Sequence, residues 1–147
     1  PGLRVLHFPT NGWFTEAAVA AVRQVRRARP DVALIVTVSI DGARELHDHI
    51  RGRRGGFDRA LATLQALLGE AGVDVHVGTT VTRENAAALG DLAVELERAA
   101  PALARRRWHW NWPQRSRHYY GNDGLALEAP PVDGLILAQI RRRGRIE

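Results

Sequence analysis

Polar side chains that could bind a small charged molecule recur at four points of the sequence. They lie in Thr10-Asn11-Gly12, in Ser39-Ile40-Asp41-Gly42 with the later Arg51, in Thr79-Thr80-Val81-Thr82, and around Asn111. Hydroxyls and amides can hydrogen-bond a ribose or an amino-acid head group, and an arginine can hold a carboxylate through paired hydrogen bonds. The combination suits a polar cofactor.

Each of these segments lies at or just after the end of a stretch with the pattern of a β-strand. We expect strands near residues 3–9, 33–40, 73–80 and 108–112. Helical spacing of apolar residues predicts intervening helices near 16–29, 57–71 and 86–100. Thr15 and Asn85 are the expected N-caps of the first and third helices. The segment 41–56 is interpreted as a polar connection, and a last helix is predicted over 134–143.

The alternation of strands and helices predicts an α/β fold with parallel strands and outer helices. Both an open doubly wound sheet and part of a closed TIM-like (β/α) barrel fit this pattern, and both place function at the carboxyl ends of the strands. The four polar segments are therefore expected at one edge. No internal repeat or linker divides residues 1–147, so we expect one domain.

Taken singly, these motifs have simpler interpretations. Thr10-Asn11-Gly12 and Ser39-Ile40-Asp41-Gly42 are also ordinary tight-turn sequences. His47, Asp48 and His49 are adjacent in a predicted loop, which disfavours convergence on one metal ion, and we assign no metal site. The glycine- and arginine-rich segment 51–56 lacks the Lys-Ser/Thr ending of a phosphate-binding loop.

Composition limits the classes of function. The chain has no cysteine, so it can supply no thiolate to a metal or an iron–sulfur cluster. All of its basic residues are arginine and the net charge is +5, but the arginine clusters are dispersed, which favours solvated helix ends over nucleic-acid contact. No apolar run is long enough to span a membrane and no secretory leader is visible, so we expect a cytoplasmic protein. The absence of methionine suggests an internal piece of a longer chain.

In combination, the motifs resemble the middle of a radical S-adenosylmethionine enzyme. The resemblance covers about residues 3–100, is most specific over 39–60, and is closest to the branch that includes peptide-modifying enzymes. The matching segments are Thr10-Asn11-Gly12, Ser39-Ile40-Asp41-Gly42, His47-Asp48, Ile50-Arg51-Gly52, Gly56-Phe57-Asp58-Arg59-Ala60, and Thr79-Thr80-Val81-Thr82 with Asn85.

The resemblance implies part of a TIM-like barrel that binds S-adenosyl-L-methionine across the carboxyl ends of its strands. In that family a 4Fe-4S cluster cleaves the cofactor to a 5′-deoxyadenosyl radical, which abstracts a hydrogen from the substrate. By position, Thr10 would lie near the cofactor, Ser39 would contact its ribose or methionine part, and Arg51 would reach its carboxylate. Asn11 and Asp41 are second choices, and Thr80 and Thr82 would face the adenosine.

The family's Cys-x-x-x-Cys-x-x-Cys segment is absent from this sequence. The resemblance therefore implies that an N-terminal barrel segment outside the chain holds the cluster, that the chain alone is inactive, and that residues 101–147 add a late strand and loops. The substrate, a peptide or a small molecule, is unknown. The alternatives are a non-catalytic α/β binding domain and an arginine-rich nucleic-acid-binding domain.

Overall fold

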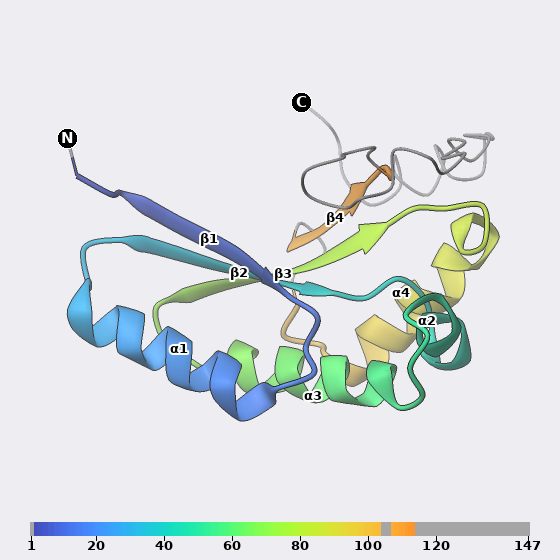
Figure 1. The fold of residues 1–147 in the computed structure, drawn as a ribbon, viewed down its shortest axis with the longest axis horizontal. Helices are drawn as coiled ribbons and strands as arrows, with labels where there is room; N and C mark the ends of the chain where they lie inside the picture. The colour runs from blue at the N-terminus through green and yellow to red at the C-terminus, as the bar shows by residue number, and fades with distance from the viewer. Residues whose placement is uncertain (1, 104–106, 114–147) are drawn as a thin grey trace.

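A parallel four-stranded sheet forms the centre of the structure (Figure 1). The computed structural model describes residues 2–103 and 107–113. The strands lie side by side in chain order: β1 (Val5–Thr10), β2 (Ala33–Ser39), β3 (Val73–Thr80) and β4 (Trp108–Asn111). The predicted α/β class with parallel strands is confirmed.

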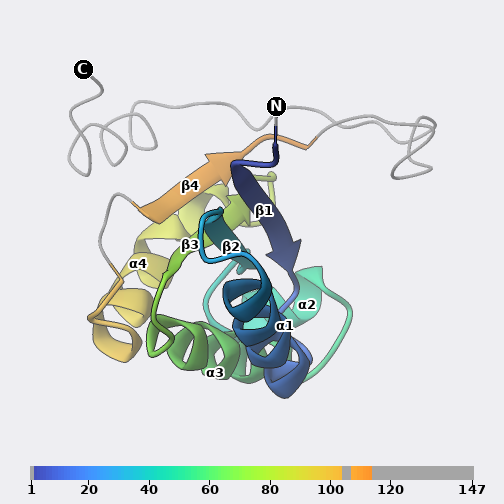
Figure 2. The ribbon, with the colours of Figure 1, turned by 90° about the vertical axis from the view of Figure 1, so that its left-hand side faces the viewer.

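The helices pack against one face of this sheet. Helices α1 (Thr15–Ala28), α3 (Gly56–Leu68) and α4 (Leu89–Ala99) connect the strands and lie on the same side (Figure 2). A doubly wound sheet reverses its strand order and carries helices on both faces, whereas a (β/α) barrel keeps strands in sequence with all helices outside. The observed arrangement is that of part of a β/α barrel.

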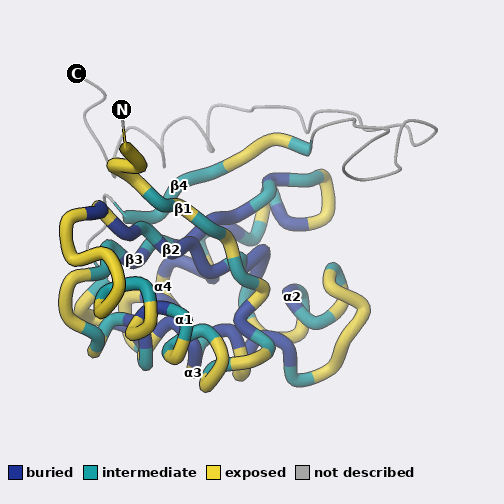
Figure 3. The backbone as a smooth tube through the Cα atoms, turned by 60° about the vertical axis from the view of Figure 1, so that its left-hand side comes forward, coloured by how far each residue is buried: buried dark blue, intermediate teal, exposed yellow. Residues whose placement is uncertain are grey.

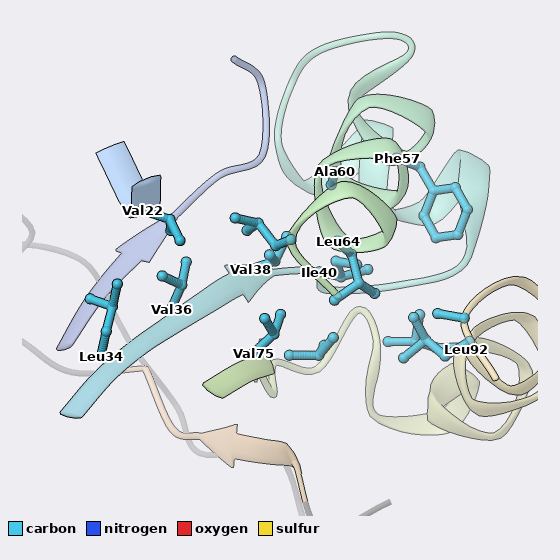
Figure 4. Close-up of a cluster of buried hydrophobic side chains, with 14 residues drawn as sticks. Val22, Leu34, Val36, Val38, Ile40, Phe57, Ala60, Leu64, Val75 and Leu92 are labelled. Atoms are coloured by element: carbon cyan, nitrogen blue, oxygen red, sulfur yellow. The ribbon is translucent and has the colours of Figure 1, made fainter. Parts of the chain in front are cut away.

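The apolar core lies between the sheet and these helices (Figure 4). Alternate residues of β2, namely Leu34, Val36 and Val38, point to the helices because successive strand side chains face opposite sides. They meet Leu64 of α3 and Leu92 of α4, both fully buried. The burial colouring is mostly dark along β2 and β3, and exposed positions increase toward the outer strands β1 and β4 (Figure 3).

The segment 41–56, interpreted above as a polar connection, contains a helix. Helix α2 (Arg44–Ile50) has seven residues, fewer than the length at which helical periodicity is recognisable in a sequence. It places His47 in the interior and half-buries Leu46 and Ile50. The prediction of an irregular connection was therefore wrong for this part of the chain.

Of the two predicted N-caps, Thr15 was wrong, and Asn85 was right in position but not in its side-chain contacts. The N-cap position of α1 is Phe14, and the Thr15 hydroxyl lies 2.6 Å from the Thr63 hydroxyl of α3. Asn85 occupies the N-cap position of a short 3-10 helix, η1 (Ala86–Ala88), but its side chain makes no capping hydrogen bond. In both cases the side chain that the sequence pattern predicts as a helix cap hydrogen-bonds instead to a residue that is distant in the sequence.

The remaining expectations concern other parts of the chain. The predicted helix over 134–143 lies outside the described residues. None of the helices in the described ranges has the length and hydropathy needed to cross a bilayer.

The turn after β1 contacts α3 so closely that only glycine fits. Gly12 has φ +72°, and a Cβ there would lie 2.5 Å from the Cα of Ala60. Thr63 of α3 donates a hydrogen bond to the Gly12 carbonyl at 2.7 Å, which fixes this approach.

Gly12→Ala should therefore destabilise the protein well beyond the roughly 1–2 kcal/mol that left-handed backbone costs a residue with a Cβ. Gly52→Ala is the matched control, because Gly52 also has positive φ, +62°, but nothing lies within 4 Å of its Cβ position. Urea unfolding of both variants measures the difference. Equal losses would contradict the steric explanation.

Candidate functional site

A cavity of about 560 Å³ opens on the face of the sheet opposite the helices. Its described lining comes from all four strands and the segment after β4: His7, Pro9, Thr37, Ser39, Gly78, Thr80, His109, Asn111, Trp112 and Pro113. Cavities of about 300–1,000 Å³ are typical of small-molecule sites. This is the cavity into which a ligand at the carboxyl edge of the strands would extend.

The strand register brings two predicted site residues to this cavity. Ser39 pairs with Gly78, and Thr80 pairs with Asn111, so these positions share one face. Ser39 follows the core residue Val38 and therefore points away from the helices. Ser39 and Thr80 thus present hydroxyls side by side at the rim.

Thr10 and Asn11 lie in the turn after β1 and do not line the cavity. Thr10 pairs with Val38, a core residue, so its side chain is on the helix side of the sheet. Its hydroxyl accepts a hydrogen bond from the Gly12 N–H at 3.1 Å. The Asn11 side-chain oxygen accepts one from the Trp13 N–H at 3.0 Å. The side chains of Thr10 and Asn11 therefore stabilise the turn after β1.

Asp41 is the centre of a network that joins the ends of β2 and β3. It is only 3% exposed. Its Oδ1 accepts a hydrogen bond from the Thr80 N–H at 2.9 Å, and its Oδ2 lies 2.6 Å from the Arg51 guanidinium. A buried carboxylate needs such partners because desolvation penalises an unpaired charge.

Arg51 reaches this network from the C-terminal end of α2. Its side chain remains 37% exposed while one nitrogen contacts Asp41. A guanidinium has five N–H donors in a planar fork, so an arginine held at one edge by a carboxylate can still offer donors elsewhere. Asp41 orients Arg51 close to Thr80, at the strand-end rim that Ser39 also occupies.

The loop behind Arg51 is held by Asp48. The carboxylate of Asp48 accepts hydrogen bonds from the N–H groups of Gly55 and Phe57, the latter at 2.8 Å. Partial desolvation opposes the charged form, but these amide hydrogen bonds outweigh it and hold the pKa of Asp48 below its usual value of 3.8. The Asp48 carboxylate thus fixes the conformation of the loop between α2 and α3.

The same loop is stacked on the turn after β1. The guanidinium of Arg53 lies 3.7 Å from the centre of the Trp13 ring, and that of Arg59 lies 4.6 Å from it. Cation–π contacts of this kind each contribute about 0.5–1 kcal/mol at exposed sites. Segments 11–13 and 51–59 therefore form one unit beside the site.

Asn85 joins three backbone groups around Asp41, a role that the sequence analysis missed. It is fully buried. Its Nδ2 donates to the carbonyls of Asp41 and Thr80 at 2.7 and 2.9 Å, and its Oδ1 accepts from the Thr82 N–H at 2.7 Å. Thr82 belongs to this loop and does not line the cavity. The sequence feature that pointed to Asn85 was its match to the motif of the radical S-adenosylmethionine enzymes, and that match did not show its hydrogen bonds.

His47 supports Asp41 from the core. It is 2% exposed, and its Nδ1 accepts a hydrogen bond from the Asp41 N–H at 3.1 Å. Because Nδ1 accepts, the ring is neutral with its proton on Nε2. Burial, followed by the charge of Arg51, lowers the pKa of His47 below 6.5 despite the opposing effect of Asp41.

This shift predicts acid destabilisation with a defined sign. A histidine whose pKa is lower in the folded state than in the unfolded state stabilises the fold above about pH 6.5 and loses that contribution as the pH falls. His47→Asn keeps an acceptor near the Nδ1 position but cannot be protonated. The variant should therefore lose less stability than wild type between pH 7.5 and 5.

Urea unfolding at several pH values checks this expectation. His49→Asn serves as the control, since His49 is exposed on the same helix. If the two variants have the same pH dependence as wild type, His47 is not the titrating group.

The donor set fits S-adenosylmethionine and does not fit an iron–sulfur cluster. Ser39, Thr80 and Arg51 offer two hydroxyls and a cation at one rim, which match a ribose and a carboxylate. No cysteine occurs in the sequence, and the described residues contain no group of three His, Cys, Asp or Glu side chains placed to hold a metal ion. Cluster ligands are therefore not supplied by this chain.

Comparison with known proteins finds two relatives that match part of the chain. The chain is 36% identical over 70 residues to the sporulation killing factor maturation protein SkfB of Bacillus subtilis, covering 48% of this chain and 17% of that protein. It is 31% identical over 109 residues to the AdoMet-dependent heme synthase of Oleidesulfovibrio alaskensis, covering 74% of this chain and 25% of that protein. Both are radical S-adenosylmethionine enzymes.

The chain is similar in sequence to radical S-adenosylmethionine enzymes. No family model matches it. The matched region spans about a sixth of one relative and a quarter of the other. This similarity agrees with the sequential parallel strands and with the polar side chains at their carboxyl ends.

Proposed function

We propose that this chain forms the S-adenosylmethionine-binding side of a radical enzyme's active site. The observation that carries the proposal is the Asp41–Arg51 pair, which lies against the Thr80 backbone at the cavity rim. Thr80 and the Ser39 hydroxyl line the same cavity. In the related radical enzymes the bound cofactor supplies, on reduction by an iron–sulfur cluster, the radical that abstracts a hydrogen from the substrate.

Each residue then has a defined task in binding. Arg51 donates to the cofactor's carboxylate, Ser39 hydrogen-bonds the ribose or methionine part, and Thr80 contacts the adenosine side. Asp41, buried beneath them, fixes the direction of Arg51, while Asn85 keeps the loops after β2 and β3 at a constant separation. The chain's part is to bind and orient; the cluster's thiolates come from outside it.

The test is calorimetric titration of S-adenosylmethionine into the full-length protein. Saturable binding is expected, and Ser39→Ala should weaken it about two- to tenfold, the usual range for one hydrogen bond. Glu45→Ala is a matched control, because Glu45 is exposed on α2 and away from the cavity. An absence of binding to wild type would leave a non-catalytic α/β domain as the better assignment.

A further inference from the structure

The deeper part of the cavity carries polar side chains that the cofactor assignment does not use. His7, Thr37 and His109, here called the histidine tier, line it from β1, β2 and β4. Thr37 and His109 each lie two residues before a rim position, Ser39 and Asn111. Because a strand rises about 3.3 Å per residue, Thr37 lies about 7 Å before Ser39 along β2, and His109 lies about 7 Å before Asn111 along β4.

The tier has hydrogen-bond donors to spare. His7 Nε2 lies 2.8 Å from the Thr37 hydroxyl. A neutral imidazole and a hydroxyl together have two hydrogens to donate, and their mutual bond uses one, so one remains whichever partner donates. The ring of His109 makes no hydrogen bond to the described residues and adds another donor.

Charge around the tier favours an acceptor with one negative charge. None of the described residues that line the cavity is acidic, and none is arginine. The nearby carboxylate of Asp74 is already paired with Arg107 at 2.8 Å and His76 at 3.0 Å. Hydrogen-bond donors that have no carboxylate beside them can bind the single negative charge of a substrate carboxylate. A phosphate dianion would need positively charged side chains, which the described lining of the cavity does not offer.

Gly78 allows two members of the histidine tier to converge. A Cβ at this position would lie 2.7 Å from the Thr37 methyl carbon and 3.2 Å from His109 Nε2. The absence of a side chain on Gly78 therefore lets Thr37 and His109 come close to each other over β3.

We propose that His7, Thr37 and His109 bind a carboxylate of the substrate beneath the cofactor. The assignment rests on the proposed function, because a cofactor at Ser39 and Thr80 leaves the deeper space to the substrate. Trp112 and Pro113 form an apolar wall for the rest of that molecule. The substrate class is accordingly a carboxylate-bearing compound.

The experiment titrates benzoate, as a carboxylate probe with an apolar ring, into the full-length protein. Benzoate should bind at least about fivefold tighter than benzyl alcohol, its uncharged analogue. His109→Phe should remove that preference, while His109→Gln, which keeps an N–H donor, should retain most of it. His49→Phe is the control, since His49 is exposed on α2 outside the cavity.

A pH series gives a second measurement that does not depend on a variant folding. Desolvation, with His76 and His7 nearby, lowers the pKa of His109 below 6.5. Among the described residues, the charged and titratable groups around it are His7, His76, Asp74 and Arg107. Benzoate affinity should increase as the pH falls from 7 to 5, because protonation of His109 adds positive charge. Affinity that is constant across this range overturns the proposal.

Four further outcomes have defined meanings. Equal affinities for benzoate and benzyl alcohol, or tighter binding of inorganic phosphate than of benzoate, would overturn the carboxylate assignment. Competitive displacement of benzoate by S-adenosylmethionine would overturn the substrate role and give the tier to the cofactor. Failure of S-adenosylmethionine itself to bind in the same samples would instead overturn the proposed function.

Discussion

Arg51→Ala should weaken S-adenosylmethionine binding about ten- to a hundredfold, because a hydrogen bond to a charged group contributes about 1.5–3 kcal/mol. The same substitution should leave the affinity for 5′-methylthioadenosine within about twofold, since that compound has the adenosine and sulfur but no carboxylate. Calorimetric titration of both ligands into the full-length protein measures the two effects.

The comparison of two ligands is needed because Arg51 also neutralises Asp41. If the variant lost affinity for both ligands equally, Arg51 would act only by keeping Asp41 and Thr80 in place. Arg51→Lys retains the charge without the planar fork and should recover only part of the affinity. Arg54→Ala removes an exposed arginine from the same loop and controls for net charge. Unchanged affinity in Arg51→Ala would remove this residue from the site.

Asn85→Ala is the substitution expected to cost the most stability, about 2–4 kcal/mol. The side chain is fully buried, and its loss leaves the Thr82 N–H and the carbonyls of Asp41 and Thr80 without their partner. Desolvated groups left unpaired are more costly than the same groups paired or exposed. Urea unfolding gives the free energy directly.

The neighbouring Glu84→Ala provides the control, because Glu84 is exposed on the same loop. Its stability should stay within about 0.5 kcal/mol of wild type. Asn85→Ala should also weaken S-adenosylmethionine binding, because the loops after β2 and β3 are no longer tied together. A stable Asn85→Ala protein would mean that water replaces the amide and that the network tolerates its loss.

The strands and long helices were predictable because burial leaves a periodic trace in the sequence. The apolar run near 33–40 and the leucine stripe of α3 each repeat at the spacing of their element. Parallel order followed from the alternation of strands and helices. The carboxyl-edge rule placed Ser39 and Thr80 at one edge of the sheet, where both line the same cavity, and their role in binding stays a prediction. The sequence did not settle the choice between an open sheet and a barrel; the helices on one face do.

The sequence could not show which distant residues each polar side chain contacts in the folded protein. Asn85 has the residue type of a helix cap, but tertiary carbonyls compete for its amide. The pairing of Arg51 with Asp41 depends on a seven-residue helix whose inward side chains include a histidine. Thr10 does not line the cavity because its position in the strand register puts its side chain on the helix side of the sheet. The sequence alone does not give this register.

The loop bearing Arg51 is fastened on both sides, by Asp48 to its own amides and through Arg53 to Trp13. The backbone entropy of this loop is therefore lost during folding, before any ligand arrives. An incoming anion then has to immobilise only the side chain, which costs about 0.5–1.5 kcal/mol. Pre-organisation of this kind favours fast association that needs no prior rearrangement of the backbone.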